Sequence, residues 1–352
     1  MRRQVLLPDQ SLTSSDNDDN DDNVEGDCRR ADIVDRPSTV AATESVNLAR
    51  SIESKIINKD YFCSYELFPT DAPDVYHRFF QVCKPLFYAL TWHDDYNTIK
   101  LDKELGKSLK CAEKFPANTL LHLVAKGLTR NLADKILNHV LRLGIVNIFI
   151  LQGGTKNINS VLKFSSKSTF LMLDTSSQEG DFIYASDLVS FVRDRFGRRF
   201  SICVAGYPEM HQSSLSKELD LFYLKNKVES GADFIITQVI FESRVFTDFV
   251  NDCQAMGIKV PIIPGLFPFE TYRELERMTK LCKVKIPSWL SEKLLPIGGD
   301  DEAVRRLGVE ITLKIIKEMR LSGISYGYHL FTLNRSKLVC EIHKQLNTNG
   351  LQ

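Results

Sequence analysis

The chain has 352 residues, with 45 basic and 45 acidic side chains and therefore a formal net charge of zero. This balance argues against a nucleic-acid-binding surface, which needs a basic excess. No apolar run approaches the ~18 residues of a membrane span. Eight scattered cysteines without a C-x-x-C pair favour reduced thiols in a cytoplasmic protein over disulfides or a metal site.

Residues 1–45 are predicted to form a disordered acidic tail. The segment 14–23 consists only of Ser, Asp and Asn, and it cannot bury enough apolar area to fold. No apolar core follows Met1, so we expect no signal peptide.

From residue 46 to 348 the pattern alternates between apolar, β-branched runs and amphipathic segments. The runs predict eight strands, at 61–68, 86–92, 119–124, 146–151, 200–205, 232–241, 260–266 and 326–333. The segments predict helices at 74–82, 103–114, 132–143, 184–196, 215–230, 246–256, 271–282, after Pro287 and at 303–321.

Eight strands alternating with helices are typical of a (β/α)8 TIM barrel, an α/β fold. The alternative is a doubly wound open sheet. That fold usually carries a Gly-rich phosphate loop after its first strand, whereas here the first strand runs into Leu67-Phe68-Pro69-Thr70. We therefore predict one barrel over residues 46–348, with its site at the carboxyl ends of the strands.

Polar or glycine residues stand at nearly every predicted strand end, which describes a ligand-lined mouth. They are Glu66, Thr91-Trp92-His93, His122, Gln152-Gly153-Gly154, Tyr207-Pro208, His211, Gln238, Pro264-Gly265 and Asn334-Arg335. Taken alone, Gln238 is a buried amide that neighbouring backbone could satisfy. The polar residues at the other strand ends favour the alternative that Gln238 contacts a ligand.

Individual residues leave structural alternatives open. Glu66 lies in an apolar strand, where burial should raise its pKa and make it a proton donor, but a structural ion pair is equally compatible. His122 by itself is more often a satisfied core histidine. Asp220 and Lys227 lie on a helix of mixed polarity and would ordinarily be solvated.

Six segments together resemble the catalytic barrel of the methylenetetrahydrofolate reductase family. They are Ser64–Pro69, Thr91–His93, Ala205–Pro208, Gly231–Gln238, Pro264–Pro268 and Phe331–Arg335, collinear between about residues 50 and 347. The resemblance implies an FAD enzyme without a Rossmann fingerprint that takes electrons from NADPH or NADH. It would reduce 5,10-methylenetetrahydrofolate to 5-methyltetrahydrofolate for methionine synthesis. It also implies a homo-oligomer, and the family's C-terminal S-adenosylmethionine-binding domain is expected to be absent.

The same resemblance implies roles for single residues. Glu66 matches the family's proton donor, and Gln238, Phe331 and Arg335 match substrate-side positions, with Phe331 in place of the usual tyrosine. The positions that match FAD contacts are Thr91, Trp92, His122, Gln152, Gly153, Gly154, Tyr184, Ala185, Tyr207, His211, Asp220 and Lys227.

Several positions depart from the family pattern. The family's Leu-Arg-Gly-Asp is here Leu151-Gln152-Gly153-Gly154, and Gln212-Ser213-Ser214 replaces Pro-Glu-Ala after His211. Gln152 and Gly154 thus lack the charges of the family's arginine and aspartate. Losing a charge that stabilises a developing cation typically lowers the rate by ~10²-fold or more. Two alternatives therefore stay open: a weakened or non-catalytic member that acts as a binding or regulatory partner, and another flavin barrel such as a proline dehydrogenase relative.

Overall fold

The computed structural model describes residues 45–82, 84–99, 106–153 and 180–348. The chain divides into two units, residues 1–42 and 43–352, and every described residue belongs to the second. The predicted tail lies outside the described residues, apart from its last position, and stays a prediction.

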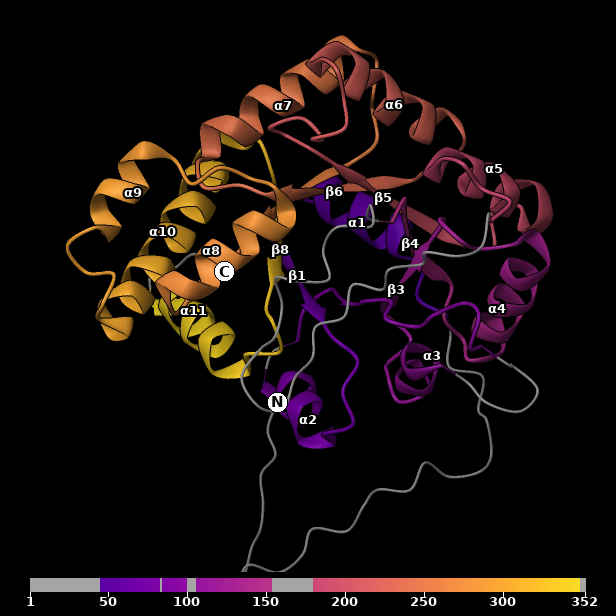
Figure 1. The fold of residues 1–352 in the computed structure, drawn as a ribbon, viewed down its shortest axis with the longest axis horizontal. Helices are drawn as coiled ribbons and strands as arrows, with labels where there is room; N and C mark the ends of the chain where they lie inside the picture. The colour runs from indigo at the N-terminus through magenta and orange to yellow at the C-terminus, as the bar shows by residue number, and fades with distance from the viewer. Residues whose placement is uncertain (1–44, 83, 100–105, 154–179, 349–352) are drawn as a thin grey trace, which may run out of the picture. The chain divides into compact units, whose positions relative to one another are not determined.

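Eight parallel strands close into a barrel in the order β1-β2-β3-β4-β5-β6-β7-β8, with β8 paired to β1. They are β1 (Phe62–Leu67), β2 (Phe87–Leu90), β3 (Thr119–Val124), β4 (Asn147–Leu151), β5 (Ser201–Gly206), β6 (Phe234–Val239), β7 (Ile262–Leu266) and β8 (Gly327–Phe331). Figure 1 shows the helices arranged around these central strands. The predicted TIM barrel is confirmed.

The helices that were predicted are all present. They are α2 (Pro73–Val82), α3 (Lys107–Ala112), α4 (Arg130–Arg142), α5 (Ala185–Phe196), α6 (Lys217–Glu229), α7 (Ser243–Ala255), α8 (Tyr272–Cys282), α9 (Ser288–Leu294) and α10 (Asp301–Ser322). Two further helices, α1 (Leu48–Ile57) and α11 (Ser336–Thr348), are not among the predicted ones, because they lie before the first strand and after the last, outside the alternating pattern.

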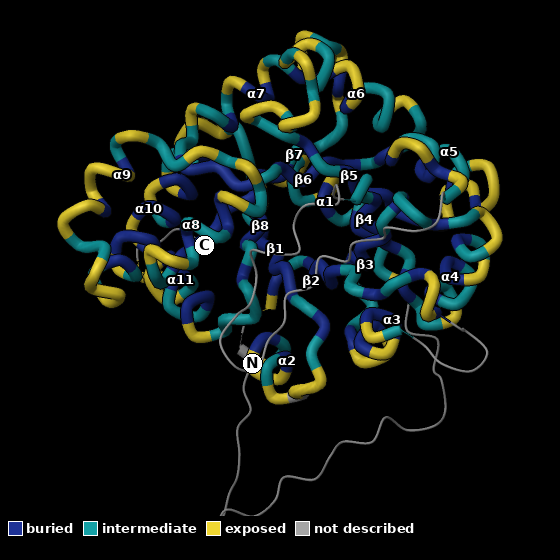
Figure 2. Tube along the Cα trace, in the orientation of Figure 1, coloured by how far each residue is buried: buried dark blue, intermediate teal, exposed yellow. Residues whose placement is uncertain are grey.

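The strands are buried on both faces, as expected for a parallel sheet covered by helices. In β1 all six residues are buried: Phe62 belongs to a cluster inside the barrel, whereas Tyr65 and Leu67 belong to the layer between strands and helices. Figure 2 shows the buried residues concentrated on the strands and the exposed ones on the outer faces of the helices. Side chains alternate between the two faces of a strand, so Ser64 and Glu66 point to the same side as Phe62, the barrel interior.

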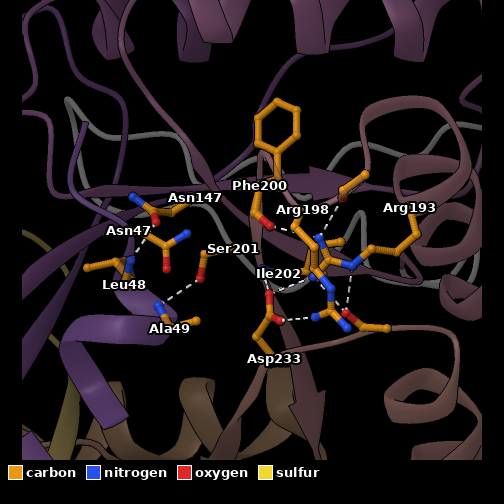
Figure 3. Close-up of polar contacts among 12 residues, drawn as sticks. Asn47, Leu48, Ala49, Asn147, Arg193, Arg198, Phe200, Ser201, Ile202 and Asp233 are labelled. Atoms are coloured by element: carbon orange, nitrogen blue, oxygen red, sulfur yellow. Dashed lines mark hydrogen bonds and ion pairs between the residues drawn. The ribbon is translucent and has the colours of Figure 1, made fainter. Parts of the chain in front are cut away.

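Helix α1 closes the amino-terminal end of the barrel. Leu48 and Ile52 are fully buried and pack in the interior cluster with residues of the strands. Its first three N–H groups each donate to a side-chain oxygen. Leu48 donates to Asn147 at 2.9 Å and Ala49 to Ser201 at 3.0 Å (Figure 3), and Arg50 donates to Asn47 at 3.1 Å. The strands themselves thus supply two of the caps that a helix amino terminus requires.

A second polar cluster ties α5 to the start of β6. Nη2 of Arg193 lies 2.6 Å from Oδ2 of Asp233, and Nη1 of Arg198 lies 3.1 Å from the other oxygen (Figure 3). Asp233 also accepts from the backbone N–H of Ile202 at 2.7 Å. Both clusters lie at the amino-terminal end of the strands, which in such barrels contributes to stability. The carboxyl-terminal end is the one that carries the active site.

Candidate active site

A cavity of about 300 Å³ opens at the carboxyl ends of the strands. Its wall combines the ends of β1 and β3 to β6, the loops after β2 and β5, Phe331 of β8 and the carboxyl-terminal end of α8. The predicted site residues that line it are Glu66, Thr91, Trp92, His122, Gln152, Gly153, Tyr207, His211, Gln238 and Phe331. Tyr184, Ala185, Asp220, Lys227 and Arg335 do not line it, and Gly154 lies outside the described residues.

Glu66 and His122 meet in the cavity wall. Oε2 of Glu66 lies 4.0 Å from Nε2 of His122, and both side chains are almost fully buried. Burial raises the pKa of Glu66 to about 8 and lowers the pKa of His122 to about 3, with the nearby imidazoles of His329 and His93 adding to the second shift. At neutral pH the pair is therefore a protonated acid beside a neutral imidazole, and not an ion pair.

Nε2 of His122 has no hydrogen-bond partner among the described residues, although it is buried. The ring packs edge-on against Phe149, with 4.7 Å between the centroids. A buried polar atom without a partner is costly unless something else satisfies it. The structural alternative of a satisfied core histidine therefore does not hold for this atom among the described residues, and His122 as a residue lines the cavity.

Gln238 satisfies only half of its amide within the protein. Its Oε1 accepts from the backbone N–H of Val239 at 2.9 Å. Among the described residues its amide nitrogen has no partner, and the side chain lines the cavity. The backbone explanation thus covers the oxygen, and the nitrogen is left to donate into the cavity.

Aromatic rings form much of the remaining wall. The indole N–H of Trp92 donates to the carbonyl of Asp94 at 2.9 Å, which fixes the ring orientation after β2. Tyr207 and His211, from the loop after β5, contact each other edge to face at 4.6 Å. Phe331 meets His329 perpendicularly at 5.1 Å. Flat apolar surfaces with few polar groups are typical of a site for a planar ligand.

Thr91 holds its place in the wall through the neighbouring strand. Its backbone N–H donates to the carbonyl of Leu67 at 3.0 Å, and its hydroxyl reaches the same oxygen at 3.5 Å. These contacts join the ends of β1 and β2, so Thr91 positions the rim beside Glu66.

The end of β4 is constrained by its own contacts. The amide nitrogen of Gln152 donates to the carbonyl of Ile183, just before α5. Gly153 has φ of +93°, and a Cβ there would stand 2.7 Å from Cγ1 of Val124. Only glycine fits this position without strain.

Asp220 and Lys227 lie on α6, behind the cavity wall. Nζ of Lys227 donates to the carbonyl of Ala205 at 2.6 Å and lies 5.7 Å from the ring centre of Tyr207. Burial lowers the pKa of Lys227 to about 8 and raises the pKa of Asp220. The sequence interpretation of these charges as ordinary solvated surface is therefore wrong.

Tyr184, Ala185 and Arg335 are engaged elsewhere. Tyr184 precedes α5, is exposed and stacks on Tyr223 at 6.0 Å, while Ala185 is buried at the first position of the helix. Nη1 of Arg335 lies 3.1 Å from Glu270 and 2.6 Å from Glu274. The roles predicted for these three residues stay predictions.

Sequence reasoning missed the wall that α8 contributes. Met278, Cys282 and Lys283 line the cavity, although none of them follows a strand. Sγ of Cys282 lies 3.3 Å from Sδ of Met278. A positive φ of 54° at Lys283 marks the end of the helix, but no sequence signal indicates that this end turns toward the strand ends.

Within the described residues, no group of three or more His, Cys, Asp or Glu side chains could hold a metal ion. None of the described helices is long and apolar enough to cross a membrane.

A family model described as methylenetetrahydrofolate reductase matches residues 51–347. Methylenetetrahydrofolate reductase (NADH) 1 of Arabidopsis thaliana is 33% identical over 292 residues, which cover 78% of this chain and 46% of the relative. Methylenetetrahydrofolate reductase 2 of Schizosaccharomyces pombe is 34% identical over 312 residues, which cover 82% and 46%. A probable methylenetetrahydrofolate reductase (NADPH) of Caenorhabditis elegans is 31% identical over 308 residues, which cover 85% and 44%.

The chain spans about half the length of the curated relatives it matches. Among solved structures, an uncharacterized protein from Clostridium thermocellum, described as binding two copies of 5-methyl-5,6,7,8-tetrahydrofolic acid, aligns with a TM-score of 0.53 and 14% identity. The alignment covers 86% of this chain and 100% of that one, and it shows a shared fold.

Proposed function

Because the chain belongs to the methylenetetrahydrofolate reductase family, we propose that its barrel reduces 5,10-methylenetetrahydrofolate to 5-methyltetrahydrofolate. The proposal includes FAD as cofactor, NADPH or NADH as reductant, and a cytoplasmic role in supplying methyl groups for methionine synthesis. The single observation that carries it is the buried, protonated Glu66 in the wall of an aromatic cavity. Family membership favours this reaction over the proline dehydrogenase alternative.

Glu66 supplies the proton that the substrate needs. The five-membered ring of the substrate must open before its methylene carbon can accept hydride, and the C–N bond breaks when the departing nitrogen takes a proton. The carboxyl of Glu66 donates that proton and becomes a carboxylate, which then faces the iminium cation left on the other nitrogen. A pKa near 8 keeps this acid protonated at neutral pH.

The residues present fit the flavin ring of FAD. Nε2 of His122, buried in the wall and without a partner among the described residues, offers a hydrogen-bonding atom, and Trp92 and Tyr207 offer apolar surface. Thr91, Gln152, Gly153 and His211 line the same space, and Tyr184, Ala185, Asp220 and Lys227 would hold the rest of the cofactor, with Gly154 beside Gly153 in sequence. When bound, FAD would supply the hydride that the methylene carbon accepts.

The substrate side of the cavity has its own donors and surfaces. The free amide nitrogen of Gln238 can donate to the edge of the pterin ring, and the ring of Phe331 can pack against its face. Phe331 pairs in register with Glu66 across β1 and β8, and Gln238 lines the same cavity. The pterin would thus lie within reach of the proton donor.

The absorbance spectrum of the purified protein tests this function. We expect flavin bands that bleach anaerobically with NADPH or NADH and return when 5,10-methylenetetrahydrofolate is added. The Glu66→Gln variant should bind and bleach in the same way but fail to recover with the folate. A colourless wild-type protein that cannot be reconstituted with FAD would overturn the proposal.

One contact favours a second candidate, a member with weakened catalysis that serves as a binding or regulatory partner. The amide nitrogen of Gln152 donates to the carbonyl of Ile183, so one of its two N–H groups is used within the protein, and the side chain has no charge to offer a ligand. The double variant Gln152→Arg with Gly154→Asp separates the two. A gain of about 100-fold in flavin reoxidation by folate would identify a degraded site, and an unchanged rate would favour the first function.

The resemblance also implies a homo-oligomer, and light scattering of the purified protein measures its oligomeric state.

A further inference from the structure

Cationic side chains are scarce in the described lining of the cavity. Among the described residues that line it, Lys283 is the one lysine or arginine, whereas the carboxyl groups are those of Glu66, Asp94 and Glu209. Glu66 is protonated at neutral pH because of its burial. Among the described lining residues, an anionic group entering the cavity therefore meets one cation, Lys283, together with the carboxyl groups of Asp94 and Glu209.

Lys283 is held there by the backbone. It is the residue at which α8 ends, with φ of 54° and ψ of 37°, the left-handed conformation that non-glycine residues rarely adopt. Its N–H closes the helix by donating to the carbonyl of Thr279. A lysine at a position that favours Gly or Asn costs the fold some stability, so the side chain merits a functional explanation.

The ammonium of Lys283 forms no hydrogen bond or ion pair with any described residue. In the part of the chain that the structure describes, no carboxylate lies within ion-pair distance of it. Its neighbours differ: Lys280 lies 3.8 Å from Glu276, and Arg335 is held by Glu270 and Glu274. Arg335 is thus compensated by two acids, while the lysine at the mouth is not.

We propose that Lys283 recognises the anionic end of the molecule that occupies the cavity. The inference rests on the proposed function, under which the pterin ring lies near Gln238 and Glu66. A folate carries its charge at the opposite end, on the carboxylates of its glutamate, so the charged end faces the mouth. The phosphates of a bound nicotinamide dinucleotide carry the same chemistry, a multivalent oxyanion, and are the other possible source.

Other titratable groups in the lining bear on this assignment. His211, on the loop after β5, lines the cavity together with Lys283, and the positive charge of Lys283 contributes to lowering the pKa of that histidine, although burial is the larger cause. The lowered pKa favours the uncharged form of His211, with Lys227 adding to the effect of Lys283 and Asp220 opposing it. The carboxyl groups of Asp94 and Glu209 also line the cavity and would repel an anion, so Lys283 is the described lining residue whose charge can attract one.

Calorimetric titration of Lys283→Asn tests the inference. Asparagine keeps the tolerance for left-handed backbone but removes the charge. The probes are 5-methyltetrahydrofolate, a 5-methyltetrahydropterin that lacks the aminobenzoylglutamate tail, NADPH and NADH. The matched controls are Lys283→Arg, which keeps the charge, and Lys280→Asn, which removes a cation outside the cavity on the same helix.

We expect Lys283→Asn to bind 5-methyltetrahydrofolate about 5-fold more weakly, the size of one accessible charge pair. Binding of the tail-less pterin should be unchanged, as should all binding by both controls. A loss confined to NADPH and NADH would assign the recognised anion to the dinucleotide phosphates and would also support the inference. Normal affinity of Lys283→Asn for every probe would overturn it. Failure of the wild-type protein to bind any folate would instead overturn the proposed function.

Discussion

Oε2 of Glu66 and Nε2 of His122 lie 4.0 Å apart in a buried wall of the cavity, and burial makes both groups neutral at pH 7. The acid holds its proton because ionisation inside the barrel is unfavourable, and the imidazole stays uncharged for the same reason. The protonated carboxyl of Glu66 thus lies beside Nε2 of His122, which has no hydrogen-bond partner among the described residues.

Glu66→Gln should lower the rate of folate-dependent flavin reoxidation by about 10²- to 10⁴-fold, the usual contribution of a general acid. Glutamine keeps the shape but has no acidic proton, so binding of 5-methyltetrahydrofolate should change little. Stopped-flow absorbance in each half-reaction measures the effect. Equal losses in the flavin reduction by NADPH or NADH would show that Glu66 serves structure and not proton transfer.

The proton on Glu66 should also make stability depend on pH. The folded state keeps this proton up to about pH 8, whereas the unfolded chain releases it near pH 4.5. The folded state thus binds more protons in that window, and the free energy of unfolding due to this group falls as pH rises from 4.5 to 8, by on the order of 4 kcal/mol.

Urea unfolding of Glu66→Gln at several pH values between 5 and 8 measures this term, because the amide does not titrate. Relative to wild type, the variant should gain stability toward the alkaline end. Glu53→Gln, at an exposed position of α1, is the control. A constant difference between wild type and Glu66→Gln across the range would contradict the raised pKa.

Gly153→Ala should destabilise the protein by about 1–3 kcal/mol. The positive φ is unfavourable for alanine, and the new Cβ would meet Val124 at 2.7 Å. Gly144→Ala separates the two effects, since Gly144 also has a positive φ but nothing within 4 Å of the added carbon. Chemical denaturation should therefore show a clearly larger loss for Gly153→Ala, and equal losses would exclude the steric explanation.

Asn147→Ala should loosen the closed end of the barrel and cost about 1–3 kcal/mol of unfolding free energy. The side chain accepts from Leu48 and donates to the carbonyls of Val46 and Thr119, so its removal leaves buried polar groups without partners. Asn97→Ala, at an exposed position, should have little effect. Hydrogen exchange of the first turn of α1 would report the loss directly. Unchanged protection there would contradict the capping role.

Asp233→Asn should cost about 3–5 kcal/mol, because it leaves the partly buried guanidinium of Arg193 without its carboxylate. The double variant with Arg193→Met should recover part of that loss, since the unpaired charge is then gone. Thermal unfolding of the three proteins gives the coupling. Additive losses would show that the two side chains act independently.

The sequence by itself determined the barrel and most of its mouth. Strands buried on both faces must be apolar throughout, so alternating apolar runs and amphipathic segments predicted the eight strands and the helices between them. A polar residue in such a run, such as Glu66 or Gln238, stands out because the interior makes it costly. The carboxyl ends of parallel strands meet at one edge, so these residues could be grouped before any contact was known.

Only the tertiary structure decided what surrounds each of these groups. The approach of α8 brought Lys283 to the mouth, and ion pairing with Glu270 and Glu274 took Arg335 away from it. Lys227 lies partly buried behind Tyr207, and this burial lowers the pKa of a side chain that the sequence alone places on the surface. Helix α1 became the closure of the barrel because Asn147 and Ser201, about 100 and 150 residues later, cap its first turn. Such contacts join distant parts of the chain, and local patterns carry no information about which distant group satisfies a given charge or N–H.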